Sequence, residues 1–481
     1  MKSTFTTLAA AARQWPERPA IIDGAGTLDY RSLWREIDAL RLQLDRRGVA
    51  EGQGIGVLAR NGRAFVISAL AVLGCGAVVM PIYFQLKPTE LADMLTRAPL
   101  AGILDDGTSP PPTDAARESL ALLDGTPLYF SRRRQNGASP FVPWITDAAF
   151  ARFTSGTTGT AKGVVLTHQN LLERIHAANA GLKLDCEDRV LWILPMAYHF
   201  LVSILLYLEV GAAIVVCPNH LAGSILDWAE QQAVTFLYAA PMHIRLLAGD
   251  VSGRKFPPTL QRVMSVSSPL QPQVAKDFFA RFGIPVTQGF GVIEIGLPIM
   301  NLDEAREHPE AIGRPVPGFE AGILDEALQP VTTGQTGQLA VRGPGMFSGY
   351  LSPPLARDAV LRDGWFLTGD LAQRNPAGLI TIAGRSKSVI NVAGHKVFPE
   401  DVAAVLEQHP AVLRSRVTTR PHPQAGEVVH ADVQLREDRP QLALEEILAF
   451  CRQQLSSYKV PASITLVTEI ELTPSGKVRH G

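Results

Sequence analysis

Short apolar runs alternate with segments of helical periodicity through most of this 481-residue chain. Residues 212–216 form one such run, and residues 234–238 form another that follows a helical segment at 227–232. Strands buried on both faces carry runs of this kind, and a helix is the usual connection between parallel strands. The alternation therefore predicts an α/β fold built from layered, mostly parallel sheets.

The C-terminal part of the chain has a different texture. From Val331 onward, short strand-like runs are separated by glycine turns, as at 337–343, which predicts a small β-rich unit. Beyond a boundary near 384–388 the pattern predicts a compact α+β module, with strands at 428–435 and 463–467. The apolar residues on one face of its predicted helix are Leu444, Ile447, Leu448, Cys451 and Leu455.

Residues 105–143 fit neither pattern. Prolines at 110–112, arginines at 132–134 and scattered small residues predict surface loops around a short helix. The basic triplet is expected to be a solvated loop rather than a binding patch.

Composition excludes several classes of protein. With 46% hydrophobic and 19% charged residues, the chain is not largely disordered. Its 45 basic and 46 acidic residues give a net charge of −1, which excludes a dedicated nucleic-acid-binding protein. The four cysteines lie far apart without a C-x-x-C pair, which argues against a disulfide framework or a zinc motif and favours a cytoplasmic setting.

The segment at 64–84 has no charged residue and is long enough to cross a bilayer. Glycines on both sides of Cys75 interrupt it, and residues 78–82 have the pattern of a strand that runs into a turn. We therefore expect a buried helix and strand of the α/β core, and no stable membrane insertion.

The loop Thr-Ser-Gly-Thr-Thr-Gly-Thr-Ala-Lys-Gly at 154–163 carries the clearest chemical signal. Its glycines permit tight turns that point amide N–H groups at an anion, and its hydroxyls and Lys162 add donors and a positive charge. This combination suits the polyphosphate of a nucleotide, although Lys162 is placed differently from the lysine of a Walker A loop. A flexible hairpin would explain the composition, but not the Lys-Gly ending against a predicted strand at 164–166.

The loop closely resembles the signature phosphate loop of the adenylate-forming superfamily. This superfamily includes acyl- and aryl-CoA synthetases, adenylation domains of peptide synthetases, and luciferases. The resemblance spans essentially the whole chain and is strongest to the carboxylate–CoA ligases. Further segments resemble the superfamily's motifs in the same order, at 288–294, 337–350, 365–370, 384–387 and 474–477.

The resemblance implies a division into domains. Residues 1–384 would form a large N-terminal AMP-binding domain of layered α/β sheets, with a small β-barrel-like subdomain at about 310–384. Residues 385–481 would form a small, mobile α+β C-terminal domain that carries the catalytic lysine.

The reaction of this superfamily joins a carboxylate to the α-phosphate of ATP, releases pyrophosphate, and then usually passes the acyl group to a thiol. By resemblance, Lys162 would hold the β- and γ-phosphates, Glu294 would bind Mg²⁺, and Lys477 would bridge the carboxylate and the α-phosphate. Asp370 would accept hydrogen bonds from the ribose hydroxyls, with Arg385 close by. The residues expected to bind the nucleotide are Thr154, Ser155, Gly156, Thr157, Thr158, Gly159, Ser268, Gln288, Gly289, Phe290, Asp370 and Arg385.

The segment at 196–202 resembles the superfamily's aromatic-His segment beside the acyl pocket. Amino-acid-activating relatives have an Asp where this chain has His199, and burying an ammonium group without that carboxylate would be costly. The chain therefore favours an apolar acid, either aromatic or short- to medium-chain aliphatic. A place in the core, instead of a role in binding, stays open for His199 and Phe290. The side chains expected in the pocket are Tyr198, His199, Phe200, Ser267 and Ile293.

Two segments depart from the superfamily's pattern. Ile293 replaces a threonine whose hydroxyl could contact a phosphate, which keeps open a degenerate nucleotide-binding protein without turnover. Val266 and Ser267 replace two glycines, and we expect them to narrow the acyl pocket.

The second half-reaction also has its expected residues. Lys387 occupies the hinge position, and Gly394 would leave room for a pantetheine arm in a thiol tunnel. The expected acceptor is coenzyme A, and the alternative is the phosphopantetheine arm of an acyl or peptidyl carrier protein. The expected partners are therefore ATP, Mg²⁺, a small carboxylic acid and one of these thiols.

Overall fold

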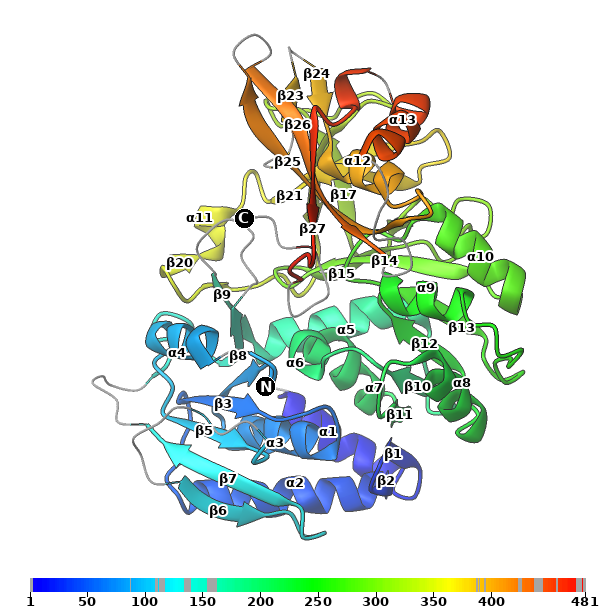
Figure 1. The fold of residues 1–481 in the computed structure, drawn as a ribbon. Helices are drawn as coiled ribbons and strands as arrows, with labels where there is room; N and C mark the ends of the chain where they lie inside the picture. The colour runs from blue at the N-terminus through cyan, green and yellow to red at the C-terminus, as the bar shows by residue number, and fades with distance from the viewer. Residues whose placement is uncertain are drawn as a thin grey trace. The chain divides into compact units, whose positions relative to one another are not determined.

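The computed structural model describes most of the chain (Figure 1). The described residues are 3–86, 88–108, 111, 117–133, 140–153, 162–385, 388, 390–392, 395–422, 426–436, 444–455, 457–472 and 478. Contacts divide the chain into two compact units, each described here by itself. The large unit comprises Met1–Pro309, Gly313–Glu320 and Arg342–Gly364, and the small unit comprises Glu310–Ile312, Ala321–Val341 and Trp365–Gly481. The domain boundary near 384–388 stays a prediction.

The first sheet of the large unit has parallel strands in its centre and antiparallel strands at its edges. Its order in the described chain is β16 (Arg314–Pro315), β15 (Gly296–Met300), β14 (Val286–Val292), β13 (Arg262–Ser265), β12 (Phe236–Ala239), β10 (Arg189–Trp192), β11 (Ala213–Val216), β1 (Pro19–Asp23) and β2 (Gly26–Asp29). Every residue of β11 and β12 is buried, as the apolar runs at 212–216 and 234–238 predicted.

The second sheet also has a parallel centre, formed by β3, β4, β5 and β8. Its order in the described chain is β20 (Leu355–Ala356), β19 (Gly349–Tyr350), β9 (Gly163–Thr167), β8 (Ala148–Phe153), β4 (Val78–Ile82), β3 (Gly54–Leu58), β5 (Gly102–Asp105), β7 (Pro127–Arg132) and β6 (Arg117–Ala121). Tyr350 pairs with Val164, so it lies beside the strand that follows Lys162. The predicted α/β class is confirmed by these two sheets.

Residues 105–143 contain a strand hairpin in their described part, and the prediction of loops around a short helix was wrong there. β6 pairs with β7, and β7 pairs with β5. Arg117 forms an ion pair with Asp105, and its guanidinium carbon lies 3.7 Å from the centre of the Tyr129 ring. These contacts between strands hold β6 in place, although its residues have little intrinsic strand preference.

Helices of the large unit pack against the sheets (Figure 1). A core cluster joins β10–β14 to α8, α9 and α10 through side chains such as Leu237, Ile244 and Phe278. The helices are α1 (Thr4–Gln14), α2 (Tyr30–Asp45), α3 (Arg63–Gly74), α4 (Pro88–Arg97), α5 (His168–Leu182), α6 (Met196–His199), the π-helical turn η1 (Phe200–Ile204), α7 (Leu205–Glu209), α8 (Ala222–Gln231), α9 (Pro241–Ala248), α10 (Pro272–Phe282) and α11 (Arg357–Val360).

The uncharged segment at 64–84 forms α3 and β4, as predicted. Residues 65–73 of α3 and all of β4 are buried, which explains why this helix is apolar on every side. Among the described residues, no helix has both the length and the apolar character needed to span a membrane. The four cysteines all lie in described segments, and each is a free thiol.

The small unit contains two sheets. The first, β17 (Glu320–Leu324), β18 (Gly337–Arg342), β21 (Phe366–Arg374) and β22 (Ile380–Arg385), is open, and no closed barrel forms in the described chain. The second has the order β24 (His395–Val397), β23 (Ile390–Val392), β26 (Gly426–Leu435) and β25 (Val412–His422), with β27 (Ser463–Val467) paired to β26. The helices are α12 (Pro399–Leu406), α13 (Leu444–Gln454) and the 3₁₀ turn η2 (Ser457–Lys459). On α13, Ile447 and Cys451 lie in the core as predicted, whereas Leu444 is exposed.

Candidate active site

Lys162 and Glu294, two of the predicted catalytic residues, meet at a tyrosine in the large unit. Lys162 directly precedes β9, Glu294 lies in the turn between β14 and β15, and Tyr350 ends β19. The Lys162 Nζ lies 4.6 Å from the centre of the Tyr350 ring, and the Tyr350 hydroxyl donates to Glu294 Oε1 at 3.1 Å. The Glu294 carbonyl also accepts the Phe347 amide at 2.7 Å, which ties the turn to the segment before β19. The sequence identified the motif that ends at Tyr350, but gave this residue no role.

Burial shifts the pKa of two groups in this cluster, the Glu294 carboxyl and the Tyr350 hydroxyl. Burial raises the pKa of the Glu294 carboxyl, while the hydrogen bond from Tyr350 and the positive charges of Arg152 and Lys162 oppose that rise. Burial, with the adjacent Glu294 charge, also raises the pKa of the Tyr350 hydroxyl. The phenol therefore stays protonated and remains a hydrogen-bond donor to the carboxylate.

Glu294 fits the expected Mg²⁺. This cation is commonly held by one or two carboxylates together with the phosphates of a nucleotide, rather than by a cage made only of protein ligands. Among the described residues there is no group of three or more His, Cys, Asp and Glu side chains that could hold a metal alone. A single carboxylate such as Glu294 is therefore enough for a site that shares the metal with a nucleotide.

Two arginines, buried Arg174 and half-buried Arg152, accompany Glu294, and the sequence analysis missed both. Arg174, on α5, donates from Nε and Nη2 to the Gly345 carbonyl at 3.1 and 2.6 Å, and from Nη1 to the Ile293 carbonyl at 3.0 Å. Burial lowers the pKa of Arg174 to about 9, so it remains a cation at neutral pH. Arg174 therefore fixes the turn that carries Glu294.

A capping box holds the helix that places Arg174. The Thr167 side chain accepts the Asn170 amide, and the Asn170 side chain accepts the Thr167 amide, at the start of α5. Because β9 ends at Thr167, the same short segment connects the strand after Lys162 to the helix that carries Arg174.

The predicted acyl-pocket residues surround a change of helix type. α6 ends at His199, and the chain continues as the π-helical turn η1, a geometry often found at functional sites. The His199 Nε2 lies 3.5 Å from the Ser267 Oγ, and its ring lies 5.9 Å from Trp192 and 6.0 Å from Tyr238. Half-buried His199 and Ser267 are thus brought together, as a shared pocket wall requires.

The other predicted pocket residues differ in exposure. Tyr198 and Ile293 are half-buried, whereas Phe200 is buried and its ring packs at 5.7 Å against Phe65 of α3. Phe200 therefore contributes to the core of the large unit. The role of each residue in substrate binding stays a prediction.

Ser267 and Val266 stand where the superfamily's motif has two glycines, and they differ in backbone conformation and burial. Ser267 has φ 80°, a left-handed conformation that favours glycine. Val266 is buried, and a Cβ built on Gly289 would approach its Cγ1 to 3.2 Å. Val266 thus fills the space over Gly289, which leaves Ser267 as the residue beside His199.

The predicted nucleotide-binding residues of the large unit lie on neighbouring elements. Ser268 lies between β13 and α10, while Gln288, Gly289 and half-buried Phe290 lie on β14. The Gln288 side chain accepts the Leu270 amide at 3.0 Å and donates to the Pro309 carbonyl at 2.6 Å. Gln288 therefore braces the loops at the end of β14, and a contact with the nucleotide stays a prediction.

In the small unit, Asp370 and Arg385 face each other across β21 and β22. The Arg385 Nε donates to Asp370 Oδ1 at 3.1 Å, and the Asp370 side chain is 7% exposed while that of Arg385 is 44% exposed. The Thr368 hydroxyl accepts the Asp370 amide at 3.1 Å. The two residues predicted to lie close together do so, and a buried carboxylate oriented by a cation can accept hydroxyl hydrogens.

The remaining predicted site residues lie outside the described residues. They are Thr154, Ser155, Gly156, Thr157, Thr158, Gly159, Lys387, Gly394 and Lys477.

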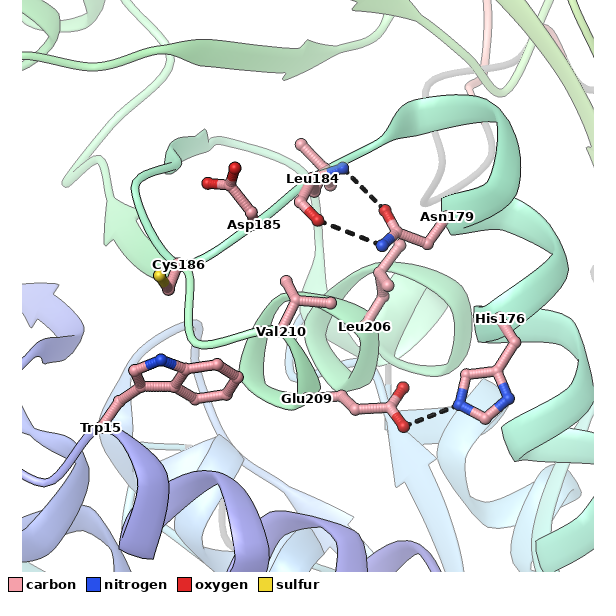
Figure 2. A pocket seen from close by; sticks show the side chains of 9 residues that line it. All are labelled: Trp15, His176, Asn179, Leu184, Asp185, Cys186, Leu206, Glu209 and Val210. Atoms are coloured by element: carbon pink, nitrogen blue, oxygen red, sulfur yellow. Dashed lines mark hydrogen bonds and ion pairs between the residues drawn. The ribbon is translucent and has the colours of Figure 1, made fainter.

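A surface pocket of about 360 Å³ lies among Trp15, α5 and α7, and none of the described site residues lines it (Figure 2). Its Asn179 side chain bonds both backbone groups of Leu184, and its His176 pairs with Glu209 at 2.7 Å. These polar groups bond to neighbouring parts of the protein and stabilise the local structure. The residues that line the pocket are not those of the candidate active site.

Comparisons with known proteins identify the family of this chain. The AMP-binding enzyme family matches residues 8–351, and the AMP-binding enzyme C-terminal domain matches residues 401–477. A sulfoacetate–CoA ligase from Cupriavidus necator is 31% identical, with 99% of this chain and 97% of that protein covered. A feruloyl-CoA synthase from an Amycolatopsis species is 28% identical, with 98% and 96% covered.

Solved structures share the fold. An o-succinylbenzoate CoA synthetase from Bacillus subtilis, in complex with its acyl-adenylate intermediate, has a TM-score of 0.86 at 21% identity, covering 99% of this chain and 97% of that one. ATP-bound MatB from Rhodopseudomonas palustris has a TM-score of 0.82 at 22% identity, with the same coverage. The predicted superfamily and enzyme class, an AMP-forming acid–thiol ligase, are confirmed by the family matches and the CoA-ligase relatives. The chain belongs to the AMP-binding enzyme family.

Proposed function

We propose that this protein activates a small carboxylic acid with ATP as an acyl-adenylate, releases pyrophosphate, and passes the acyl group to coenzyme A. The observation that carries the proposal is the contact of Lys162 and Glu294 through Tyr350, in a chain matched by the AMP-binding enzyme family over most of its length. A carboxylate that attacks a polyanion is opposed by charge repulsion, so a site for this reaction needs fixed cations. Lys162, Arg152 and Arg174 supply three cations around one carboxylate.

Each residue then has a defined task. Lys162 holds the β- and γ-phosphates, and Tyr350 orients Glu294 through its hydrogen bond. Glu294 would hold Mg²⁺, which would supply positive charge to the phosphate oxygens. Asp370 accepts the ribose hydroxyls while Arg385 holds its carboxylate in place. Lys477 bridges the acid and the α-phosphate, a role that rests on the motif alone.

The acid is proposed to be apolar, aromatic or short- to medium-chain aliphatic, without an ammonium group. His199 has Ser267, Trp192 and Tyr238 around it, and none of these offers a carboxylate to an ammonium. Relatives named for feruloyl and sulfoacetate show that this level of similarity spans aromatic and short acids.

Coenzyme A is proposed as the acceptor, with Lys387 as the hinge and Gly394 in the thiol tunnel. The relatives named above are CoA ligases, which favours coenzyme A over a carrier protein. A cytoplasmic setting is proposed from the cysteine pattern of the sequence.

The test is pyrophosphate release with ATP and Mg²⁺ across aliphatic, aromatic and amino acids, without a thiol. We expect release with apolar acids and none with amino acids. Addition of coenzyme A, or of a purified carrier protein in a parallel reaction, then identifies the acceptor by the mass of the thioester. ATP binding without release for any acid would favour the degenerate alternative instead.

A further inference from the structure

Arg152 lies where the two predicted binding regions meet. It is the penultimate residue of β8, so the predicted phosphate loop begins two residues later. Its side chain reaches the acyl segment, because Nη1 donates to the Tyr198 carbonyl and the guanidinium carbon lies 5.5 Å from the centre of the Tyr198 ring. One cation thus contacts the segment expected to line the acid pocket and lies two residues before the loop expected to hold phosphates.

One donor of this cation is unused. The Arg152 Nε is buried, and it has no hydrogen-bond partner among the residues that the structure describes. Arg174 provides an internal comparison, since it lies in the same cluster but donates from Nε, Nη1 and Nη2 to backbone carbonyls. A buried N–H donor without an acceptor is unfavourable, which indicates that the Nε of half-buried Arg152 is arranged for an acceptor supplied from outside the protein.

The charge around Arg152 supports the same conclusion. Burial lowers the pKa of Arg152 to about 10, so the group is still a cation at neutral pH. The carboxylate that favours its charged form is Glu294. In the proposed function Glu294 binds Mg²⁺, and its negative charge is then shared with the metal. With Mg²⁺ on Glu294, less of the negative charge of that carboxylate would be available to Arg152, and another anion could replace it.

We infer that Arg152 is a substrate-binding residue whose Nε–H donates to an anionic oxygen, either of the acid's carboxylate or of a phosphate of ATP. Both oxygens carry the same chemistry and both lie beside β8 in the proposed function, on which this inference rests. Arginine suits this position because its guanidinium group can donate to the Tyr198 carbonyl from one nitrogen and to an anion from another.

The experiment compares Arg152→Met and Arg152→Lys with the intact protein. Calorimetric titration with ATP and Mg²⁺ measures nucleotide affinity without turnover, and pyrophosphate release measures the KM of an acid that the intact protein accepts. Because the proposed hydrogen bond is charge-assisted, Arg152→Met should raise either the Kd of ATP or the KM of the acid by at least about tenfold. A change in the ATP titration identifies a phosphate as the partner, and a change confined to the KM of the acid identifies the carboxylate. Arg152→Lys keeps the charge but lacks the Nε–H, so it should show a smaller rise.

The matched control is Arg133→Met. Arg133 donates from Nη1 to the Leu95 and Ala98 carbonyls at 3.1 and 3.4 Å, and burial lowers its pKa as well. Within the described part of the chain, its hydrogen bonds reach no predicted site residue. Its substitution should lower thermal stability and leave both constants unchanged.

If folded Arg152 variants lose only stability, as the control does, the inference is wrong. If no acid supports pyrophosphate release by the intact protein, the proposed function fails, and the ATP titration alone then decides the role of Arg152. If Arg152→Met does not fold, Arg152→Lys carries the test.

Discussion

The Nζ of Lys162 lies 4.6 Å from the centre of the Tyr350 ring, on a tyrosine whose hydroxyl donates to Glu294. Tyr350 therefore contacts the cation before β9 through its ring and the carboxylate between β14 and β15 through its hydroxyl. The two interactions can be separated, because phenylalanine keeps the ring and loses only the hydrogen bond.

Tyr350→Phe should raise the Mg²⁺ concentration required for half-maximal pyrophosphate release by about tenfold, since a hydrogen bond to a charged group contributes about 1.5–3 kcal/mol. The affinity for ATP in the absence of Mg²⁺ should change little, because the ring still faces Lys162. Tyr350→Leu removes the cation–π contact as well and should weaken ATP binding without Mg²⁺. Equal Mg²⁺ requirements in the intact protein and Tyr350→Phe would contradict the role of the hydroxyl.

Glu294→Gln should change the pH dependence of stability in a defined direction. The folded protein raises the pKa of Glu294 above its unfolded value, so it binds the proton more tightly than the unfolded chain does. The free energy of unfolding therefore falls as pH rises from the ordinary glutamate pKa, about 4.3, through the raised value. Without ATP or Mg²⁺, Glu294→Gln should unfold at a higher temperature than the intact protein at pH 7.5, and this gain should disappear near pH 4.

Glu304→Gln is the control for this pH experiment. Glu304 forms an ion pair with Arg314 at 2.6 Å, and its side chain is 31% exposed. Its loss should not stabilise the protein at pH 7.5. A Glu294→Gln variant that is less stable than the intact protein at pH 7.5 would show that the surrounding cations outweigh burial.

Asp370→Asn should weaken the binding of ATP by about tenfold or more, because the amide cannot replace a charged acceptor held by Arg385. The loss should be specific to the ribose, so the affinity for 2′,3′-dideoxy-ATP should be nearly the same in the variant and the intact protein. Glu320→Gln is a suitable control, since Glu320 is an exposed carboxylate that pairs with Arg342 at 2.6 Å. An equal loss for both nucleotides would place the ribose elsewhere.

The sequence could predict features that depend on local pattern. β4 at Val78–Ile82 and β27 at Ser463–Val467 match the predicted strands residue for residue, because their apolar runs are bounded by turn residues. Motif order likewise predicts roles for Lys162, Glu294, Asp370 and Arg385 from the sequence alone.

Arg152 and Arg174 could not be found in the same way, because their partners are backbone carbonyls far away in the chain. Arg174 bonds Gly345 across 171 positions, and Arg152 bonds Tyr198 across 46. A carbonyl belongs to every residue type, so no pattern of side chains marks it as an acceptor. An available signal was a charged residue, Arg152, inside the apolar run that forms β8.

Lys477→Ala tests the division of the reaction into two steps. Its motif predicts that adenylate formation is lost, while thiolysis of a preformed acyl-adenylate by coenzyme A survives because the second geometry does not use this lysine. Both steps are measured in the same preparation, by pyrophosphate release and by thioester mass. Loss of both steps in a folded variant would contradict the assignment of Lys477.

Ser267→Gly should make the protein more stable and the acyl pocket less selective. Ser267 has φ 80°, and a left-handed conformation costs a non-glycine residue roughly 1–2 kcal/mol, part of which glycine loses again through its greater unfolded-state entropy. We expect a net rise of about 0.5–1 kcal/mol in the free energy of unfolding, measured with denaturant. Removal of the hydroxyl that lies 3.5 Å from His199 Nε2 should also raise the kcat/KM ratio of bulky to small acids.

Two further variants separate strain from contact at this position. Ser267→Ala retains the strained backbone and loses the hydroxyl, so it should shift acid preference without a gain in stability. Leu328, at φ 61°, has the same kind of strain in the turn between β17 and β18 of the small unit. Leu328→Gly should therefore increase stability and leave acid preference unchanged. If Ser267→Gly and Leu328→Gly gave the same stability gain and neither Ser267 variant altered acid preference, the strain at Ser267 would be unrelated to the acyl pocket.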